Sequence, residues 1–223
     1  MRFVISFFLF SCILLACNQA PTTTKNQEEK KTGLNQDLIL ELSQMVKEDQ
    51  DIQYATVSKS ERVKDSLHQQ KDLIFEKNGK RAIQIFEKYG FPGYDLVGER
   101  GANDFWIIVQ HFDKNIPFQE KVLEQMKMEV SKGNANNKKY AYLVDRVFKN
   151  KGAKQMYGTQ VQYLDDFWIA PQPLQDSLNV NQRREKIGME SIEDYLNLAM
   201  LTHFKMNKAV YEKAGLSGPR IYK

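Results

Sequence analysis

The apolar residues that follow residue 33 recur at intervals of three and four, which is the period of an amphipathic helix. In the first such stretch they are Leu34, Leu38, Leu42, Met45 and Val46. All of them would lie on one face of a single helix. The pattern therefore predicts that the folded part of the chain begins with a helix whose apolar face packs against the rest of the domain.

A second helical stretch covers residues 60–89. Asn78-Gly79 lies in its middle, and we expect a break there because glycine weakens a helix interior. Gly90 and Pro92 end the stretch, since glycine adopts the left-handed conformation after a helix and proline cannot continue one. Residues 91–101, which are rich in glycine, are predicted to form a structured loop.

The next segments also have helical patterns. Residues 105–109 are apolar on every side, which predicts a buried central helix, with a buried strand as the alternative. Pro117 begins another helix, because proline is favoured in a first turn. A further apolar stripe runs from Tyr140 to Phe148 and ends at Gly152.

The period changes to two between residues 157 and 163, as in a half-buried strand. Residues 164–166 would then form a turn, and residues 167–170 would pair back with the first strand. A last helix begins after Ser191, whose hydroxyl can cap it. The predicted fold is mainly α, formally α+β, with several helices and one β-hairpin near residues 155–170.

The first 16 residues have the pattern of a secretory signal. An almost unbroken apolar run extends from Phe3 to Leu15, and the small Ala16 directly precedes Cys17. This pattern is typical of bacterial lipoproteins, in which the cysteine is lipidated and becomes the first residue of the mature chain. The run is shorter than the roughly 20 residues that cross a bilayer, so a transmembrane helix is the disfavoured alternative. Cys12 is a rival acceptor, but the bulky Phe10 would lie near its cleavage site.

Residues 17–33 contain almost no apolar side chains and are predicted to be a flexible tether. Residues 34–223 then form a single domain. Asn18, and not an aspartate, follows Cys17, which by the sorting rule of enteric bacteria favours the periplasmic side of the outer membrane. The membrane, reached through the lipid on Cys17, is therefore one predicted partner.

Composition disfavours several classes of function. The formal net charge is only +4 and no basic stripe is interleaved with aromatic residues, so nucleic acid is not an expected partner. The only cysteines, Cys12 and Cys17, precede the domain, which excludes disulfides, cysteine zinc sites and a cysteine nucleophile within it. The chain also has no glycine-rich phosphate loop, paired-histidine motif or serine-nucleophile elbow. We therefore predict no cofactor and no standard metal centre.

Short motifs between Gly90 and Leu198 have the order and spacing of a known family. They are Gly90-Phe91-Pro92-Gly93, Leu96-Val97-Gly98, Gly101-Ala102, Trp106 to His111 with Asp113, Tyr142 to Val147, Gln155 to Gln160, Arg183-Arg184 and Ile187-Gly188. On these residues the chain resembles an uncharacterised bacterial family, domain-of-unknown-function family 6624. Phe91 and Asp166 stand where that family often has tryptophan and glycine. The resemblance implies a shared fold unit and brings no known activity.

His111 and Asp113 are the first candidates for chemistry. They could ligate a metal or form an acid–base pair, because histidine titrates near neutral pH. Residues two apart do not share a helix face, so a joint role requires the helix to end near Phe112. The alternative is a helix C-terminus at which a histidine is favourable to the helix dipole.

Asp145 and Arg146 form the second candidate pair. Arg146 could bind a carboxylate or phosphate while Asp145 acts as a base or ligand. The alternative is a structural salt bridge, or hydrogen bonds that brace a loop. Tyr157 and Gln160 lie in a polar run whose glycine suggests a close approach, which suits a saccharide or peptide ligand. The alternative there is a hairpin whose glutamines cap neighbouring helices, and Arg183-Arg184 is predicted to lie on a solvated helix face.

Three functions follow from these candidates, and whether the protein is an enzyme is left open. The favoured one is a lipid-anchored envelope domain that binds a polar ligand or an envelope protein through residues 92–101 and the hairpin. Its ligand-binding residues would be Arg146, Tyr157 and Gln160. A purely structural envelope lipoprotein is a further possibility.

The alternative from a different class is a metal-dependent or acid–base hydrolase of the cell envelope. His111, Asp113 and Asp145 would be its acids, bases or ligands, and Arg146 and Gln160 would orient the substrate. This hypothesis requires those polar groups to converge in one open cleft.

Overall fold

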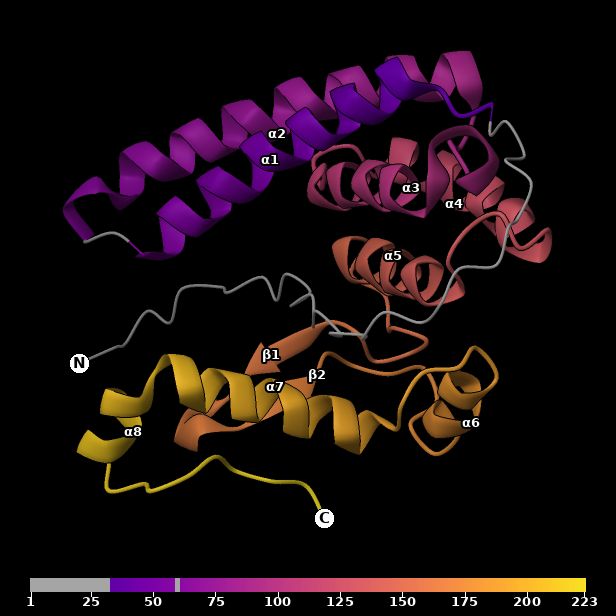
Figure 1. Ribbon diagram of the computed structural model, residues 1–223. Coiled ribbons are helices and arrows are strands. Elements are labelled where there is room, and N and C mark those ends of the chain that lie inside the picture. The colour runs from indigo at the N-terminus through magenta and orange to yellow at the C-terminus, as the bar shows by residue number, and fades with distance from the viewer. Residues whose placement is uncertain (1–32, 59–60) are drawn as a thin grey trace, which may run out of the picture. The chain divides into compact units, whose positions relative to one another are not determined.

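The computed structural model describes residues 33–58 and 61–223 (Figure 1). The predicted signal, Cys17 and all of the tether except Gly33 lie outside the described residues. The described chain is mainly helical, with one two-stranded antiparallel sheet, which confirms the predicted fold class. Within these residues, no helix combines the length and the apolar character that crossing a membrane requires.

Two long helices, α1 (Gln36–Ser58) and α2 (Glu61–Tyr89), pack against each other. Asn35 caps the first of them, because its Oδ1 accepts a hydrogen bond from the amide of Leu38 at 3.1 Å. The apolar face predicted for α1 is confirmed, since Leu38, Leu42 and Met45 are buried. Helix α2 ends as predicted at Gly90, whose φ of +70° is the left-handed conformation.

The break predicted at Asn78-Gly79 is wrong, because α2 continues through both residues. Asn78 is buried, and its Nδ2 donates to the carbonyl of Met45 at 3.1 Å, which ties α2 to α1. Gly79 lies against the ring of Phe112, where an added Cβ would be only 2.3 Å from Cγ. The glycine therefore permits a close approach between α2 and the end of α3, and it does not interrupt the helix.

Helix α3 (Tyr94–His111) replaces most of the loop predicted for residues 91–101. Its backbone is kinked at Gly98, which has a φ of +70° and a ψ of 172°. Gly101 lies close to Val97, where an added Cβ would meet the valine Cβ at 2.7 Å. The glycines that suggested a loop thus provide a kink and a close contact. The buried helix predicted over 105–109 is confirmed as part of α3, and the strand alternative is wrong.

Helices α4 (Ile116–Ser131) and α5 (Asn137–Asn150) complete the first half of the fold. Asn115 and Asn136 cap them, and Pro117 lies in the first turn of α4 as predicted. Helix α4 packs against α5, and both contact α3. The core between α1, α2, α3, α4 and α5 is formed chiefly by Leu42, Ala82, Ile85, Phe105, Ile108, Val109, Val122, Met126 and Leu143.

The hairpin is present but shorter than predicted. Strand β1 (Val161–Tyr163) pairs with β2 (Ile169–Pro171) around a short 3-10 turn, η1 (Asp165–Phe167). Residues 157–160, predicted to belong to the first strand, form an irregular loop instead. The amides of Tyr157, Thr159 and Gln160 donate to side chains, so they are not available for a sheet partner, although the carbonyl of Gln160 still accepts from the amide of Gln172 at 2.8 Å.

Helix α7 (Ile192–Met206) packs on β2 and has the N-cap predicted from sequence. The hydroxyl of Ser191 accepts a hydrogen bond from the amide of Asp194 at 3.0 Å. Two further short helices are present. Helix α6 (Val180–Glu185) contains Arg183-Arg184, which were predicted to lie on a helix, whereas α8 (Lys208–Lys213) was not predicted and follows the helix that was expected to be the last. Both pack against α7.

Candidate functional site

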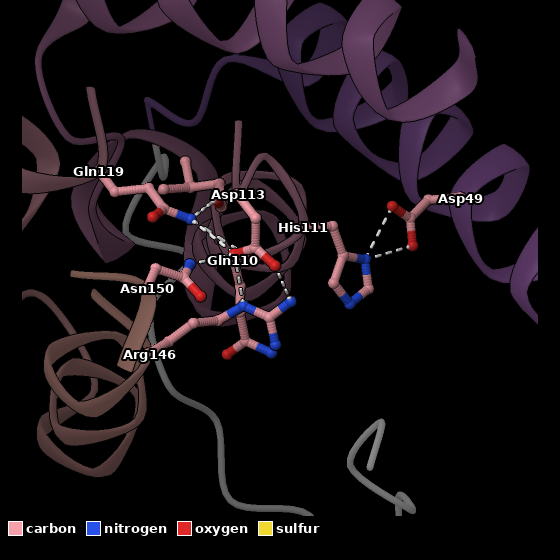
Figure 2. Close-up of polar contacts among 8 residues, drawn as sticks. Asp49, Gln110, His111, Asp113, Gln119, Arg146 and Asn150 are labelled. Atoms are coloured by element: carbon pink, nitrogen blue, oxygen red, sulfur yellow. Dashed lines mark hydrogen bonds and ion pairs between the residues drawn. The ribbon is translucent and has the colours of Figure 1, made fainter. Parts of the chain in front are cut away.

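A cluster of polar side chains surrounds the C-terminal end of α3 (Figure 2). Helix α3 ends at His111, and Phe112 leaves the helix with a φ of −86° and a ψ of 51°. The turn lets side chains on either side of Phe112 face different neighbours. We call this group the polar cluster; it consists of Asp49 from α1, Gln110, His111 and Asp113 from the end of α3, Gln119 from α4, and Arg146 and Asn150 from α5.

His111 pairs with Asp49, and not with Asp113. Its Nδ1 lies 2.8 Å and 2.9 Å from the two carboxylate oxygens of Asp49. The pair is buried, with side-chain exposures of 4% for His111 and 1% for Asp49. Phe75 of α2 stacks on the imidazole at a centroid distance of 5.0 Å. Three helices therefore hold this ring in one orientation.

Sequence reasoning missed Asp49, although a signal for it exists. The residue follows Met45 by four positions and precedes Ile52 by three, so it continues the apolar stripe of α1. Both of these neighbours are buried. A carboxylate on the buried face of a helix needs a partner, which is a reason to look for one.

Asp113 pairs with Arg146 through two parallel hydrogen bonds. Nε donates to Oδ1 at 2.8 Å and Nη2 donates to Oδ2 at 2.6 Å. Asn150 also donates to Oδ1, at 2.7 Å. Burial favours a raised pKa for Asp113, but the charge and hydrogen bonds of Arg146 outweigh it and hold the pKa below its usual value. The arginine fork that was predicted to bind a ligand's anion is therefore occupied by a carboxylate of the same chain.

Gln110 and Gln119 each have a buried side-chain oxygen, Oε1, that has no hydrogen-bond partner among the described residues. Gln110 is 8% exposed and so lies nearer the surface than Gln119, which is 0% exposed. Gln119 also donates from Nε2 to the carbonyl of Val109 at 3.0 Å and so caps the end of α3. In the view of Figure 2, the side chains of Gln110, His111 and Arg146 extend toward the same side of α3.

Asp145 lies outside this cluster, although it precedes Arg146 in sequence. It is fully buried, and its carboxylate accepts hydrogen bonds from the amides of Met156, Tyr157 and Thr159 at 2.7, 3.0 and 2.9 Å. Burial raises the pKa of Asp145, and these three amides oppose that shift. Asp145 was considered either as a base or ligand or as a residue whose hydrogen bonds brace a loop. The three accepted hydrogen bonds are the second arrangement.

Three carbonyls of the same loop accept hydrogen bonds from side chains of α6 and α7. The donors are Arg183 Nε to Met156 O at 2.8 Å, Arg184 Nη1 to Tyr157 O at 2.8 Å and Tyr195 Oη to Thr159 O at 2.7 Å. The solvated helix face predicted for both arginines is wrong for Arg184, which has an exposure of 0%. Its guanidinium is buried, and the carbonyls of Tyr157 and Glu190 supply acceptors for it.

Tyr157 and Gln160, predicted to bind a ligand, belong to this braced loop. The amide of Gln160 donates to the side chain of the fully buried Gln155 at 2.9 Å, and its carbonyl accepts from that side chain at 2.8 Å. Burial raises the pKa of Tyr157. In the described part of the chain, no hydrogen bond joins either residue to the polar cluster. The structure therefore brings Arg146 together with His111 and Asp113, and it separates them from Asp145, Tyr157 and Gln160.

A cavity of about 150 Å³ adjoins the start of α3. Phe91, Tyr94 and Trp106 line it, together with Lys139, whose Nζ lies 4.2 Å from the centre of the Trp106 ring. It therefore draws on residues 91–101, the segment expected to bind a ligand. The cavity is smaller than the roughly 300–1,000 Å³ of ordinary ligand pockets.

Metal binding was considered for His111 and Asp113. Within residues 33–58 and 61–223, no three histidine, cysteine, aspartate or glutamate side chains are grouped as metal ligands. Each of the two residues instead turns to a partner of its own, Asp49 for His111 and Arg146 for Asp113.

The protein is thus a mainly α domain. It has a buried polar cluster at the C-terminal end of α3 and, before the hairpin, a loop that is held by hydrogen bonds to buried side chains. The chain belongs to a family of unknown function, DUF6624, whose model matches residues 36–205. This match confirms the resemblance noted from the motifs and extends it to the two N-terminal helices. A search of curated proteins found no match, and a search of solved structures found none.

Proposed function

We propose that this chain is a lipid-anchored protein of the bacterial cell envelope whose domain binds a polar ligand at the polar cluster. The observation that carries the ligand site is the buried and unpaired Oε1 of Gln110. A buried polar atom without a partner costs about 1–3 kcal/mol. Proteins retain such a cost chiefly at functional sites, where a bound group can satisfy the atom.

The anchoring part of the proposal rests on the sequence before the domain. Ala16-Cys17 ends an apolar run that has the length and flanks of a secretory signal. Lipid attached to Cys17 would hold the domain at the periplasmic side of the outer membrane, with residues 18–33 as the spacer. One acyl chain gives only marginal attachment, so a stable anchor needs more than one chain on this residue.

A hydrolase is the second candidate, and a single contact favours it. An aspartate that holds Nδ1 of a histidine leaves Nε2 for proton transfer, which is the relation between the two residues in catalytic triads. Asp49 and His111 have this relation. The other acids in the predicted hydrolase, Asp113 and Asp145, are each engaged by groups of the protein, and this weighs toward binding over catalysis.

Replacing Cys17 with serine is expected to abolish lipidation, because the thiol is the only acceptor of the acyl-glyceryl group in this proposal. Cells fed radiolabelled palmitate should label the wild-type chain and leave Cys17→Ser unlabelled. Cys12→Ser serves as the matched control and should retain the label. Labelling that survives in Cys17→Ser and disappears in Cys12→Ser would assign the anchor to the other cysteine.

Replacing Gln110 with leucine is expected to stabilise the ligand-free domain by about 1 kcal/mol, because it removes a buried oxygen that has no partner. Gln155→Leu is the matched control, because Gln155 is a fully buried glutamine whose side-chain oxygen and nitrogen are both hydrogen-bonded. It should destabilise the domain by at least a similar amount, since it removes these bonds. Urea unfolding measures both changes.

Binding is tested on the same variants with soluble cell-wall fragments released by a muramidase. These fragments should raise the melting temperature of the wild type and leave that of Gln110→Leu unchanged. A Gln110→Leu variant that is less stable than the wild type, or that responds equally to the fragments, would contradict the site.

A further inference from the structure

The charges of the polar cluster nearly cancel. Asp113 neutralises Arg146 through two hydrogen bonds, and Asp49 faces the imidazole of His111. Lys149 is a half-buried neighbour whose charge interacts with those of Arg146 and Asp113, and it adds one positive charge. With a neutral His111, the charges of Asp49, Asp113, Arg146 and Lys149 sum to zero. The cluster therefore offers no net positive charge to a phosphate or carboxylate ligand.

The contact with Asp49 also decides which nitrogen of His111 carries a proton. Both carboxylate oxygens lie within 2.9 Å of Nδ1. An ionised carboxylate can only accept, so Nδ1 must be the donor. In a neutral imidazole the other nitrogen, Nε2, is then an acceptor. No described residue donates a hydrogen bond to Nε2.

The polar cluster thus contains two hydrogen-bond acceptors on adjacent residues, and it carries no net positive charge. One is Nε2 of His111, and the other is the unpaired Oε1 of Gln110. Sulfate and carboxylate groups are fully ionised near neutral pH and have no proton to donate to either atom. A hydroxyl group can donate to these acceptors, and it can also accept from the Gln110 amide.

We propose that Asp49 is a positioning residue that holds His111 in the Nδ1–H tautomer, and that the polar cluster thereby selects a neutral hydroxylated ligand, the chemical class of sugars. This inference rests on the proposed function, because it specifies the ligand of the same site. The tautomer itself does not depend on any ligand.

The tautomer is tested by nitrogen NMR on the full-length chain, labelled with ¹⁵N-histidine and purified in a detergent without a sugar headgroup. The chain has 3 histidines, and His111→Gln identifies the signals of the site. At pH 7.5, Nδ1 of His111 should have the shift of a protonated nitrogen and Nε2 that of an unprotonated one. Asp49→Asn should populate the other tautomer, because its amide can donate to Nδ1. Asp51→Asn, an exposed position on the same helix, should change neither signal.

The ligand class is tested by titrating two probes into the same samples, N-acetylglucosamine and sulfate. The sugar should move the Nε2 signal of the wild type, and sulfate, which has no proton at this pH, should not. The sugar should bind Asp49→Asn about tenfold more weakly, which corresponds to the loss of roughly one hydrogen bond, while Asp51→Asn should bind it like the wild type.

Three results would overturn the proposal. A wild-type His111 that is doubly protonated or carries its proton on Nε2 refutes the role of Asp49. A response to sulfate, or no response to N-acetylglucosamine up to its solubility limit, refutes the ligand class. If the tautomer differs from the expected one, the Gln110 variants still test the proposed function separately, because they leave His111 unchanged.

Discussion

Replacing Asp145 with alanine is expected to destabilise the domain by roughly 3–6 kcal/mol, because it leaves three amides without an acceptor at about 1–2 kcal/mol each, the lower part of the usual range since two of them are only partly buried. That loss is comparable with the total stability of many small domains. The amides belong to Met156, Tyr157 and Thr159, so hydrogen exchange of residues 156–159 should accelerate first. Urea unfolding and exchange measured by mass spectrometry follow the two effects.

A milder variant keeps the Asp145 experiment informative if the alanine variant does not fold. Asp145→Asn retains one accepting oxygen and turns an amide donor toward the remaining backbone donors, so it should lose about half as much stability. Asp165→Asn is the control, because Asp165 is exposed and its replacement should stay within about 0.5 kcal/mol. If Asp145→Ala lost no more stability than Asp165→Asn, the carboxylate would not brace the loop.

Replacing Gly79 with alanine is expected to destabilise the domain by about 2–3 kcal/mol, although glycine to alanine inside a helix normally stabilises by up to about 1 kcal/mol. The reason is the ring of Phe112, whose Cγ, Cδ1 and Cδ2 would lie 2.3–2.5 Å from the new Cβ. Helix α2 or the end of α3 would have to move. Urea unfolding measures the change.

A double-mutant cycle separates this clash from other effects of the substitution. Phe112→Ala removes the ring and should itself cost about 3–5 kcal/mol. In that background Gly79→Ala should become neutral or stabilising, because the helix preference for alanine is no longer opposed. Equal destabilisation by Gly79→Ala in both backgrounds would show that the ring is not the cause.

Much of the helical part of the fold could be predicted because its signals are local. The apolar stripe that begins at Leu38, the proline at 117 and the serine at 191 each act within one or two turns of backbone. The errors arose where one local signal has two physical causes. Glycine at position 79 indicates either a weak helix or a close contact, and only the position of Phe112 distinguishes them.

The candidate site was predictable only in part. His111, Asp113 and Arg146 were identified, and all of them lie in the polar cluster. Asp49, which is 62 residues before His111, was missed because nothing in sequence specifies which distant carboxylate meets a given imidazole. Adjacent residues also separated: Arg146 faces the cluster, whereas Asp145 faces the loop before the hairpin.

The sequence by itself determined most of the helices, the cap at Ser191, the family and most of the candidate residues, because these depend on spacing along the chain and on backbone preferences. It also carries the lipoprotein pattern at Cys17, which remains a prediction. Only the tertiary structure decided the partners of the charged groups. A buried charge is stable only beside a complementary one, and which groups meet depends on how the helices pack. The pairing of Asp49 with His111 and of Asp113 with Arg146, and with it the neutral character of the cluster, is a property of that packing.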